Sequence, residues 1–494
     1  MRHFSFHYAG LSSSRKRWIL WIAAGVLLRL ILIAFPRPSD DDTGTYLELG
    51  HNLLHRFIYG IADGDSLSPS LFRLPGYPLF LAVIESLFAR ISQFAWMNAV
   101  FAVQAAADLT GGVLLAAFAR RHLSPRAGEV VLALAMLCPF TAAYTGIALT
   151  ECLSVFAISL GIFAAGRVLG QAEVGGRDGW ALVLAGCAAA IAMLLRPDGA
   201  LLFAALGAGL FGYTVRSRGA GQGGRGGVRP AMARAGVFCM VALLPLVPWT
   251  LRNWRQFHVF QPLAPRYVSD PGERVNLGFY RWMRTWSVEY ASTGNVFWSV
   301  GADNIDLDDM PQAAFDSPQQ REQTAELLDQ YNRGHSISPE LDNRFAALAA
   351  ERIRSHPLRY YLVVPMLRAV DMVLRPRTEA FYIDVYWWRW SEHPGQTLLA
   401  VLLGLINLGY VGLAAWAFLR GRVPWAWMLG GYLVLRCLLL ATMENPEPRY
   451  TLECFPIVIV AAGAALAARP KPDRQAALSR PDADYAQHAA RMAL

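Results

Sequence analysis

Long apolar runs separated by short polar segments dominate the pattern along this chain. Ten of the runs have the composition of membrane-spanning helices, although several are shorter than the roughly 20 residues that a straight crossing needs. Hydrocarbon offers the backbone no hydrogen-bonding partner and the runs show no alternation, so we predict helices rather than a barrel. The candidate spans are residues 18–35, 94–119, 128–147, 150–165, 180–195, 198–213, 235–250, 396–419, 423–442 and 450–468.

Two further apolar stretches fit poorly as spans. Residues 77–91 are short, and a crossing there would place Arg120 and Arg121 on the outer side of the membrane. Residues 352–377 carry several charged side chains among the apolar ones. We therefore predict that both stretches lie as helices on the outer membrane surface. A bundle of twelve spans stays open as the alternative.

Composition and charge support a membrane protein. Hydrophobic residues make up 54% of the chain and charged residues only 17%, which is more apolar material than a soluble core can hide. The basic residues are nearly all arginine and lie in short loops between apolar runs, which predicts that those loops are cytoplasmic. This placement explains the net charge of +8 without a nucleic-acid partner. The predicted fold class is an all-α polytopic membrane protein.

The orientation rule also divides the chain into parts. These are a cytoplasmic N-terminus, an N-terminal transmembrane module, an extracytoplasmic cap with interfacial helices, the C-terminal transmembrane helices and a cytoplasmic tail, with bounds 1–17, 18–250, 251–395, 396–468 and 469–494. The cap segment is too long for a bare loop, so we expect it to be mostly helical. The chemistry is expected outside, above all in the first outer loop, residues 36–93.

Three adjacent carboxylates, Asp40, Asp41 and Asp42, follow the first span directly. Their mutual repulsion can raise the pKa of at least one of them, which suits a general base. The alternative is a solvated acidic turn or a helix N-cap. The aspartates alone do not decide between these interpretations.

The residues that follow the aspartates add a more specific pattern. Asp42 precedes Tyr46 by four residues, Gly50 and a leucine pair come next, and residues 73–78 read Arg-Leu-Pro-Gly-Tyr-Pro. This combination resembles the first outer loop of the GT-C glycosyltransferases, specifically the superfamily of protein O-mannosyltransferases and lipid A aminoarabinose transferases. The resemblance implies a GT-C-type bundle of about 10, or 12, transmembrane helices.

That resemblance also implies roles for residues of this loop. Asp42 would be the catalytic base, and a slip of one residue in the alignment would give this role to Asp41. Many relatives carry Asp-Glu where this chain has Asp42 and Thr43, so a second acid must come from Asp41, Asp40 or elsewhere. The expected substrate contacts in the loop are Asp40, Tyr46, Arg73 and Tyr77.

Later parts of the chain carry similar features in the order found in the family. Glu151 opens a span from the outer side, and Arg196 lies in an outer turn; a helix cap and a plain hairpin turn are the alternatives. Arg252, beside an interfacial Trp249, is a candidate for phosphate binding. The remaining expected substrate contacts are in the last outer turn and at the start of the last span: Glu444, Arg449 and Tyr450.

The resemblance implies a reaction. The donor is a sugar on a polyprenyl phosphate, arginines stabilise the leaving phosphate, and the Asp base deprotonates an acceptor hydroxyl, with inversion at the anomeric carbon. The acceptor is a lipid, a glycan or a protein, and membrane lipids surround the bundle. We predict no cofactor and no metal site, although Asp40, Asp41, Asp42 and Glu151 leave a divalent metal open. The expected location is the bacterial cytoplasmic membrane, with the active site on the extracytoplasmic side.

Two rival hypotheses belong to other classes. A transporter or flippase of a lipid-linked sugar would use the intramembrane charges Asp108 and Arg29, and a noncatalytic envelope scaffold would use the cap for binding. Lone charges inside a membrane need partners, so we expect Asp108 to form a structural ion pair with Arg29 or Arg436. The enzyme hypothesis makes its own geometric prediction: the aspartates after the first span and Arg449 before the last span meet in one outer pocket.

Overall fold

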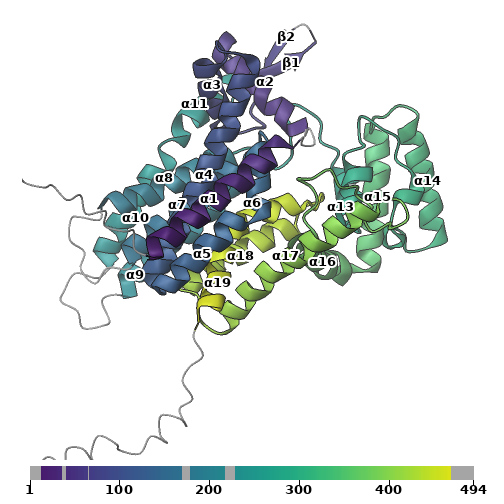
Figure 1. Ribbon diagram of the computed structural model, residues 1–494. Coiled ribbons are helices and arrows are strands. Elements are labelled where there is room, and N and C mark those ends of the chain that lie inside the picture. The colour runs from purple at the N-terminus through teal and green to yellow at the C-terminus, as the bar shows by residue number, and fades with distance from the viewer. Residues whose placement is uncertain (1–12, 36–40, 65, 170–178, 217–227, 469–494) are drawn as a thin grey trace, which may run out of the picture.

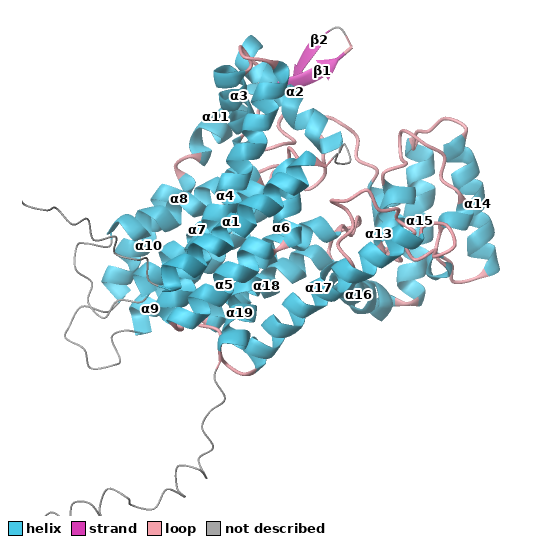
Figure 2. Cartoon of the chain, viewed as in Figure 1, coloured by secondary structure: helices cyan, strands magenta, loops and turns pink. Residues whose placement is uncertain are grey.

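The computed structural model describes residues 13–35, 41–64, 66–169, 179–216 and 228–468 (Figure 1). The predicted tail and most of the predicted cytoplasmic N-terminus lie outside the described residues. Helices make up nearly all of the regular structure, and two short strands pair beside them (Figure 2). The prediction of an all-α polytopic fold is therefore confirmed for the bundle and the cap, and corrected by one small hairpin in the first outer loop.

The membrane bundle combines N-terminal and C-terminal helices, which pack side by side (Figure 1). By length and composition, six helices can cross a membrane, or up to eight if each of two bent pairs counts as one span; three further apolar helices are shorter. The bundle helices are α1 (Ser13–Ala34), α4 (Gln93–His122), α5 (Pro125–Leu137), α6 (Pro139–Ala143), α7 (Glu151–Leu169), α8 (Gly179–Leu195), α9 (Ala200–Arg216), α10 (Val228–Leu243), α11 (Leu246–Phe257), α17 (Pro394–Leu419), α18 (Ala426–Ala441) and α19 (Phe455–Ala467). Short 3-10 turns precede two of them: η2 (Pro197–Gly199) before α9 and η7 (Pro448–Cys454) before α19.

Two of the predicted spans are bent rather than straight. The span expected at 128–147 consists of α5 followed by Pro139–Gly146, with a bend of 40°. The span expected at 235–250 consists of Ala231–Leu243 followed by Leu246–Phe257, with a bend of 52°. Pro139 begins the second half of the first pair and Pro245 precedes the second half of the other. Proline lacks the amide donor that a continuous helix needs, which explains both breaks.

The first outer loop folds into α2 (Asp41–Arg56), a hairpin of β1 (Gly60–Asp63) and β2 (Ser66–Pro69), and α3 (Gly76–Phe88). The strands are antiparallel, with Gly60 opposite Pro69, and Gly64 has a positive φ of 59° at the turn, as tight hairpins require. The predicted surface helix at 77–91 corresponds to α3. One side of α3 exposes Leu79, Val83 and Leu87, which fits the predicted membrane-surface location.

The cap lies to one side of the bundle and has its own apolar core around Trp282, Trp286 and Phe345 (Figure 1). Ser317 and Ser338 cap the two long cap helices, and each is followed by a proline at the first helical position. The second predicted surface stretch, 352–377, is not one continuous helix. Residues 352–355 end one helix, and residues 364–374 form a separate helix. The helices are α12 (Leu277–Arg284), α13 (Tyr290–Ser292), α14 (Pro318–Asn332), α15 (Pro339–Ser355) and α16 (Val364–Leu374), with short irregular turns η3 (Thr293–Phe297), η4 (Leu307–Asp309), η5 (Gln312–Ala314) and η6 (Arg359–Val363).

A buried ion pair joins α1 to α4 within the bundle. The Arg29 guanidinium donates to Asp108 Oδ2 from Nε at 2.9 Å and from Nη2 at 2.5 Å. It also donates to backbone carbonyls of Gly25 at 3.0 Å and Met136 at 2.6 Å. The expected structural pair of Asp108 with Arg29 is therefore confirmed, and Arg436 has other partners.

Candidate active site

Asp42, at the start of α2, meets arginines from two distant parts of the chain. Its Oδ2 accepts a hydrogen bond from Arg449 Nη2 at 3.0 Å, across 407 residues of sequence. Its Oδ1 pairs with Arg73, which lies between β2 and α3. The prediction that the aspartate after the first span meets the arginine before the last span is confirmed for Asp42 and Arg449.

Arg449 is held in place by residues that the sequence alone did not single out. Its Nε lies 2.5 Å from Glu447 Oε2, and the Glu447 carboxylate also accepts a hydrogen bond from Trp298 Nε1 at 3.1 Å. Trp298 follows the π-turn η3 of the cap segment, so the cap helps to orient Arg449. A tryptophan indole N–H can only donate, which makes an acidic partner such as Glu447 the natural acceptor.

A second ionic cluster surrounds Arg196. Its guanidinium pairs with Glu151 at 2.9 Å, and with Asp198 and Glu453 at 3.3 Å each. Arg436 completes the cluster, at 3.0 Å from Asp198 and 2.7 Å from Glu453. The predicted site residues Glu151 and Arg196 are thus brought together. Glu453 was not among the predicted site residues. Its position as an acidic residue inside the last apolar run was the signal in the sequence that could have identified it.

Aromatic rings contact the arginines of both clusters. The Arg196 guanidinium lies 5.6 Å from the centroid of the Tyr450 ring, and the Arg449 guanidinium lies 5.5 Å from it. On the other side, Arg73 lies 5.5 Å from the centroid of the Tyr46 ring. Such contacts between guanidinium groups and aromatic faces are attractive and orient the arginines.

Tyr77 packs against Tyr46 and so supports this arrangement. Its ring contacts that of Tyr46 edge to face, with centroids 5.3 Å apart, and its hydroxyl donates to Gln104 Oε1 at 2.8 Å. Both tyrosines are buried, and burial raises the pKa of each phenol above its ordinary value. Neither phenol is suited to act as an anionic base at neutral pH, and substrate contact by Tyr46 and Tyr77 stays a prediction.

Burial and three arginines determine the electrostatics of Asp42. Burial alone would raise the pKa of Asp42, but the positive charges of Arg449, Arg73 and Arg196 outweigh burial and lower the pKa below its ordinary value. Whether repulsion raises the pKa of another of the three aspartates stays a prediction, because the side chains of Asp40 and Asp41 lie outside the described part of the chain. Asp42 is an ionised carboxylate at neutral pH in this arginine-rich surrounding.

Some predicted site residues are not brought to Asp42. Arg252 donates to the backbone carbonyls of Ser70 at 2.6 Å and Tyr59 at 2.7 Å, which ties the outer hairpin to α11. Glu444 lies 3.7 Å from Arg266, on the side of the cap. Substrate binding by Arg252 and Glu444 stays a prediction. Asp40 lies outside the described residues, and the structure describes only the backbone of Asp41.

Comparisons with known proteins define the fold. No family model matches the sequence, and no curated protein matches it. Among solved structures, the oligosaccharyltransferase of Archaeoglobus fulgidus in its apo form is 13% identical, with a TM-score of 0.50 over 93% of this chain and 51% of that one. This chain therefore spans about half the length of that enzyme. The apo structure of ArnT from Cupriavidus metallidurans is 15% identical, with a TM-score of 0.39 over 92% of this chain and 78% of that one.

At these identities the likeness concerns the fold. The match to the Archaeoglobus fulgidus oligosaccharyltransferase runs over nearly the whole of this chain. This chain therefore adopts the polytopic membrane fold of that oligosaccharyltransferase.

Proposed function

We propose that this protein is a membrane glycosyltransferase that moves a sugar from a polyprenyl-phosphate carrier to an acceptor hydroxyl on the extracytoplasmic side. The observation that carries the proposal is the meeting of Asp42 with Arg73 and Arg449 at the outer ends of distant segments. The solved protein with this fold and the higher TM-score bears the name oligosaccharyltransferase, which agrees with glycosyl transfer as the general kind of reaction.

The two arginines would bind the donor phosphate. Guanidinium groups bind phosphate by paired hydrogen bonds and keep their charge at any working pH. The carboxylate of Asp42 pairs with both arginines. A phosphate that enters this site would compete for them and would draw them away from Asp42.

This exchange would prepare the base. The arginines hold the pKa of Asp42 low, so the pKa should rise when the phosphate takes over their charge. Asp42 would then accept the proton of the acceptor hydroxyl as its oxygen forms a bond to the anomeric carbon. The bond from that carbon to the phosphate oxygen breaks at the same time, and the polyprenyl phosphate leaves with the electron pair. A single displacement of this kind inverts the anomeric centre.

No step of the proposed reaction involves a metal ion. Arg73, Arg196 and Arg449 supply the positive charge that a leaving phosphate needs. Tyr46, Tyr77 and Tyr450 hold these arginines through their rings or support the rings that do. The bacterial cytoplasmic membrane remains the proposed location, because arginine-rich short loops fit the orientation rule.

The transporter hypothesis receives no support from the intramembrane charges. Arg29 donates to Asp108 and to carbonyls of α1 and α5, which makes the pair a fixed structural link. A transport site would need a charge that can exchange partners.

The test compares Asp42→Asn with Asp108→Asn in purified full-length protein. Wild type is incubated with undecaprenyl-phosphate sugars of several kinds and with lipid, glycan or peptide acceptors, and products are identified by mass spectrometry. We expect transfer by the wild type and none by Asp42→Asn, although the variant still elutes as a folded protein in size exclusion and unfolds cooperatively. Transfer by Asp42→Asn at the wild-type rate would overturn the proposal, and loss of lipid-sugar transport in Asp108→Asn alone would favour the transporter.

A further inference from the structure

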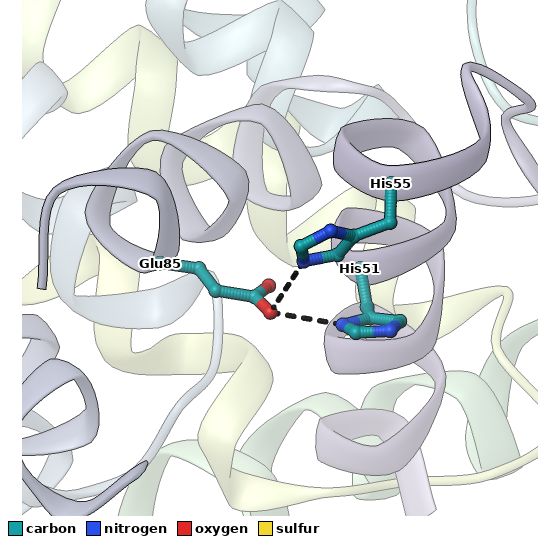
Figure 3. Close-up of side chains that lie close together, drawn as sticks. All are labelled: His51, His55 and Glu85. Atoms are coloured by element: carbon teal, nitrogen blue, oxygen red, sulfur yellow. Dashed lines mark hydrogen bonds and ion pairs between the residues drawn. The ribbon is translucent and has the colours of Figure 1, made fainter. Parts of the chain in front are cut away.

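Two histidines and one glutamate converge where α2 meets α3 (Figure 3). His51 Nδ1 lies 2.9 Å from Glu85 Oε1, and His55 Nε2 lies 3.2 Å from the same oxygen. One ligand atom from each of the three residues lies within 4.8 Å of the other two. Among the residues that the structure describes, this is the one group of three or more histidine, cysteine or acidic side chains close enough to share a metal ion.

The local structure explains why these side chains meet. His51 and His55 are one helical turn apart on α2, so their rings project from the same face. Gly50 lets α3 approach this face, because a β-carbon at position 50 would lie only 2.9 Å from the carbonyl oxygen of Pro78. Glu85 lies on the buried side of α3 and therefore points at α2.

The chemistry of the group is that of a cation site. The Glu85 side chain is 10% exposed, and a buried carboxylate is costly unless a positive charge compensates it. Neutral imidazoles can donate hydrogen bonds to it but carry no charge. Zinc ligands at about 2.0–2.1 Å from the metal in a tetrahedral site lie roughly 3.3 Å apart, which is close to the observed separations of the nitrogens from the carboxylate oxygen.

We propose that His51, His55 and Glu85 bind a divalent cation of the zinc class at the α2–α3 interface. Two imidazoles and one carboxylate suit Zn²⁺ or Co²⁺, whereas Mg²⁺ and Ca²⁺ prefer oxygen ligands. Either ring nitrogen of a histidine can ligate a metal, so the use of Nδ1 from one residue and Nε2 from the other presents no difficulty. Three protein ligands leave a fourth position, and both histidine side chains are about half exposed, which gives a water molecule access to it.

The site is separate from the proposed phosphate site but shares its framework. Helix α2 carries Asp42 in its first turn, and Arg73 precedes α3 by a few residues. A metal that joins α2 to α3 would therefore fix the relative position of Asp42 and Arg73. In this account His51, His55 and Glu85 act as positioning residues and do not touch the donor sugar.

The test measures metal binding directly. Full-length protein is purified in detergent through a tag that contains no histidine, stripped with a chelator, and titrated with Zn²⁺ against a chromophoric competitor. Co²⁺ is added in parallel, and its visible absorption is recorded. The variants are Glu85→Gln, which keeps the shape but removes the charge, and His51→Asn at a half-exposed position. His356→Ala, an exposed histidine on the cap, is the matched control.

We expect one equivalent of Zn²⁺ per chain in wild type and His356→Ala, and a loss of affinity of about 100-fold or more in both site variants, since changes even to outer-shell partners cost about 10–100-fold. Zn²⁺ should also raise the thermal midpoint of the wild type and leave that of Glu85→Gln unchanged. Equal Zn²⁺ affinity in wild type and both site variants would overturn the proposal. So would a stripped wild type that binds no Zn²⁺, because the three residues would then form a hydrogen-bonded cluster only.

Discussion

The contact between Arg449 and Asp42 gives the most informative perturbation of the proposed site. Arg449→Gln keeps a polar, though shorter, side chain and removes the charge that faces Asp42 Oδ2 at 3.0 Å and Glu447 Oε2 at 2.5 Å. The Arg449 side chain is only 8% exposed, so water cannot replace its interactions. Glu447 would lose the positive charge at 2.5 Å, and Asp42 would lose one of its two arginine partners, in a poorly solvated place.

The magnitude follows from the proposed role of Arg449. Loss of one preorganised donor to a developing negative charge costs about 10²–10³-fold in rate, or about 2.7–4 kcal/mol. We therefore expect Arg449→Gln to reduce kcat/KM for sugar transfer by about that factor. Arg449→Lys retains the charge but loses the forked geometry, so its activity should fall between those of the wild type and the glutamine variant.

The assay is the initial rate of transfer from an undecaprenyl-phosphate sugar, with thermal unfolding of each variant as a check of folding. Arg266→Gln is the control, because Arg266 faces Glu444 near the same outer turn but is half exposed and lies outside the Asp42 cluster. It should change the rate by less than about twofold, as exposed ion pairs contribute little. Wild-type transfer by a folded Arg449→Gln protein would refute the role given to this arginine.

Three further predictions concern pH, the bundle and the cap. Because the folded-state pKa of Asp42 is lowered, its ion pairs add stability that is present above the unfolded pKa of about 3.9 and is lost only as pH falls through the lower folded value. The difference in thermal midpoint between wild type and Asp42→Asn should therefore stay constant from about pH 5 to pH 8; a decline within that window would contradict the direction of the shift. Arg29→Leu leaves the Asp108 charge buried and should destabilise the fold by about 3 kcal/mol, measured by thermal unfolding in detergent. The double variant Arg29→Leu/Asp108→Leu should recover most of this loss. A single variant more stable than the double would contradict this expectation. Trp298→Phe removes one hydrogen bond to Glu447 and should slow transfer by about fivefold, equivalent to about 1 kcal/mol, and a rate equal to that of the wild type would show that the cap does not orient this carboxylate.

The sequence predicted the parts of this molecule that depend on order along the chain. Apolar runs and arginine-rich loops give the topology, and the topology places the end of the first span and the start of the last on one side. The resemblance around Asp42 and Arg73 then indicated which residues would meet. The contact of Asp42 with Arg449 agrees with both lines of reasoning.

The parts that were missed depend on contacts between distant segments. The guanidinium of Arg252 donates to two backbone carbonyls beside the β1–β2 hairpin, and no pattern in the sequence predicts such acceptors; its binding of phosphate stays a prediction. Glu453 and Arg436 are single charges in apolar runs, and only the packing of α18 against η7 reveals that they pair. The spacing of His51 and His55 is ordinary for a helix until α3 brings Glu85 to them.

In the proposed reaction, Asp42 and the donor phosphate compete for the same arginines, Arg73 and Arg449. The affinity of undecaprenyl phosphate for wild type and for Asp42→Asn, measured at equilibrium in purified protein, tests this claim directly. We predict that Asp42→Asn binds the lipid phosphate more tightly than the wild type, because Arg73 and Arg449 are no longer engaged by a carboxylate. Weaker binding by a folded Asp42→Asn protein would contradict the account.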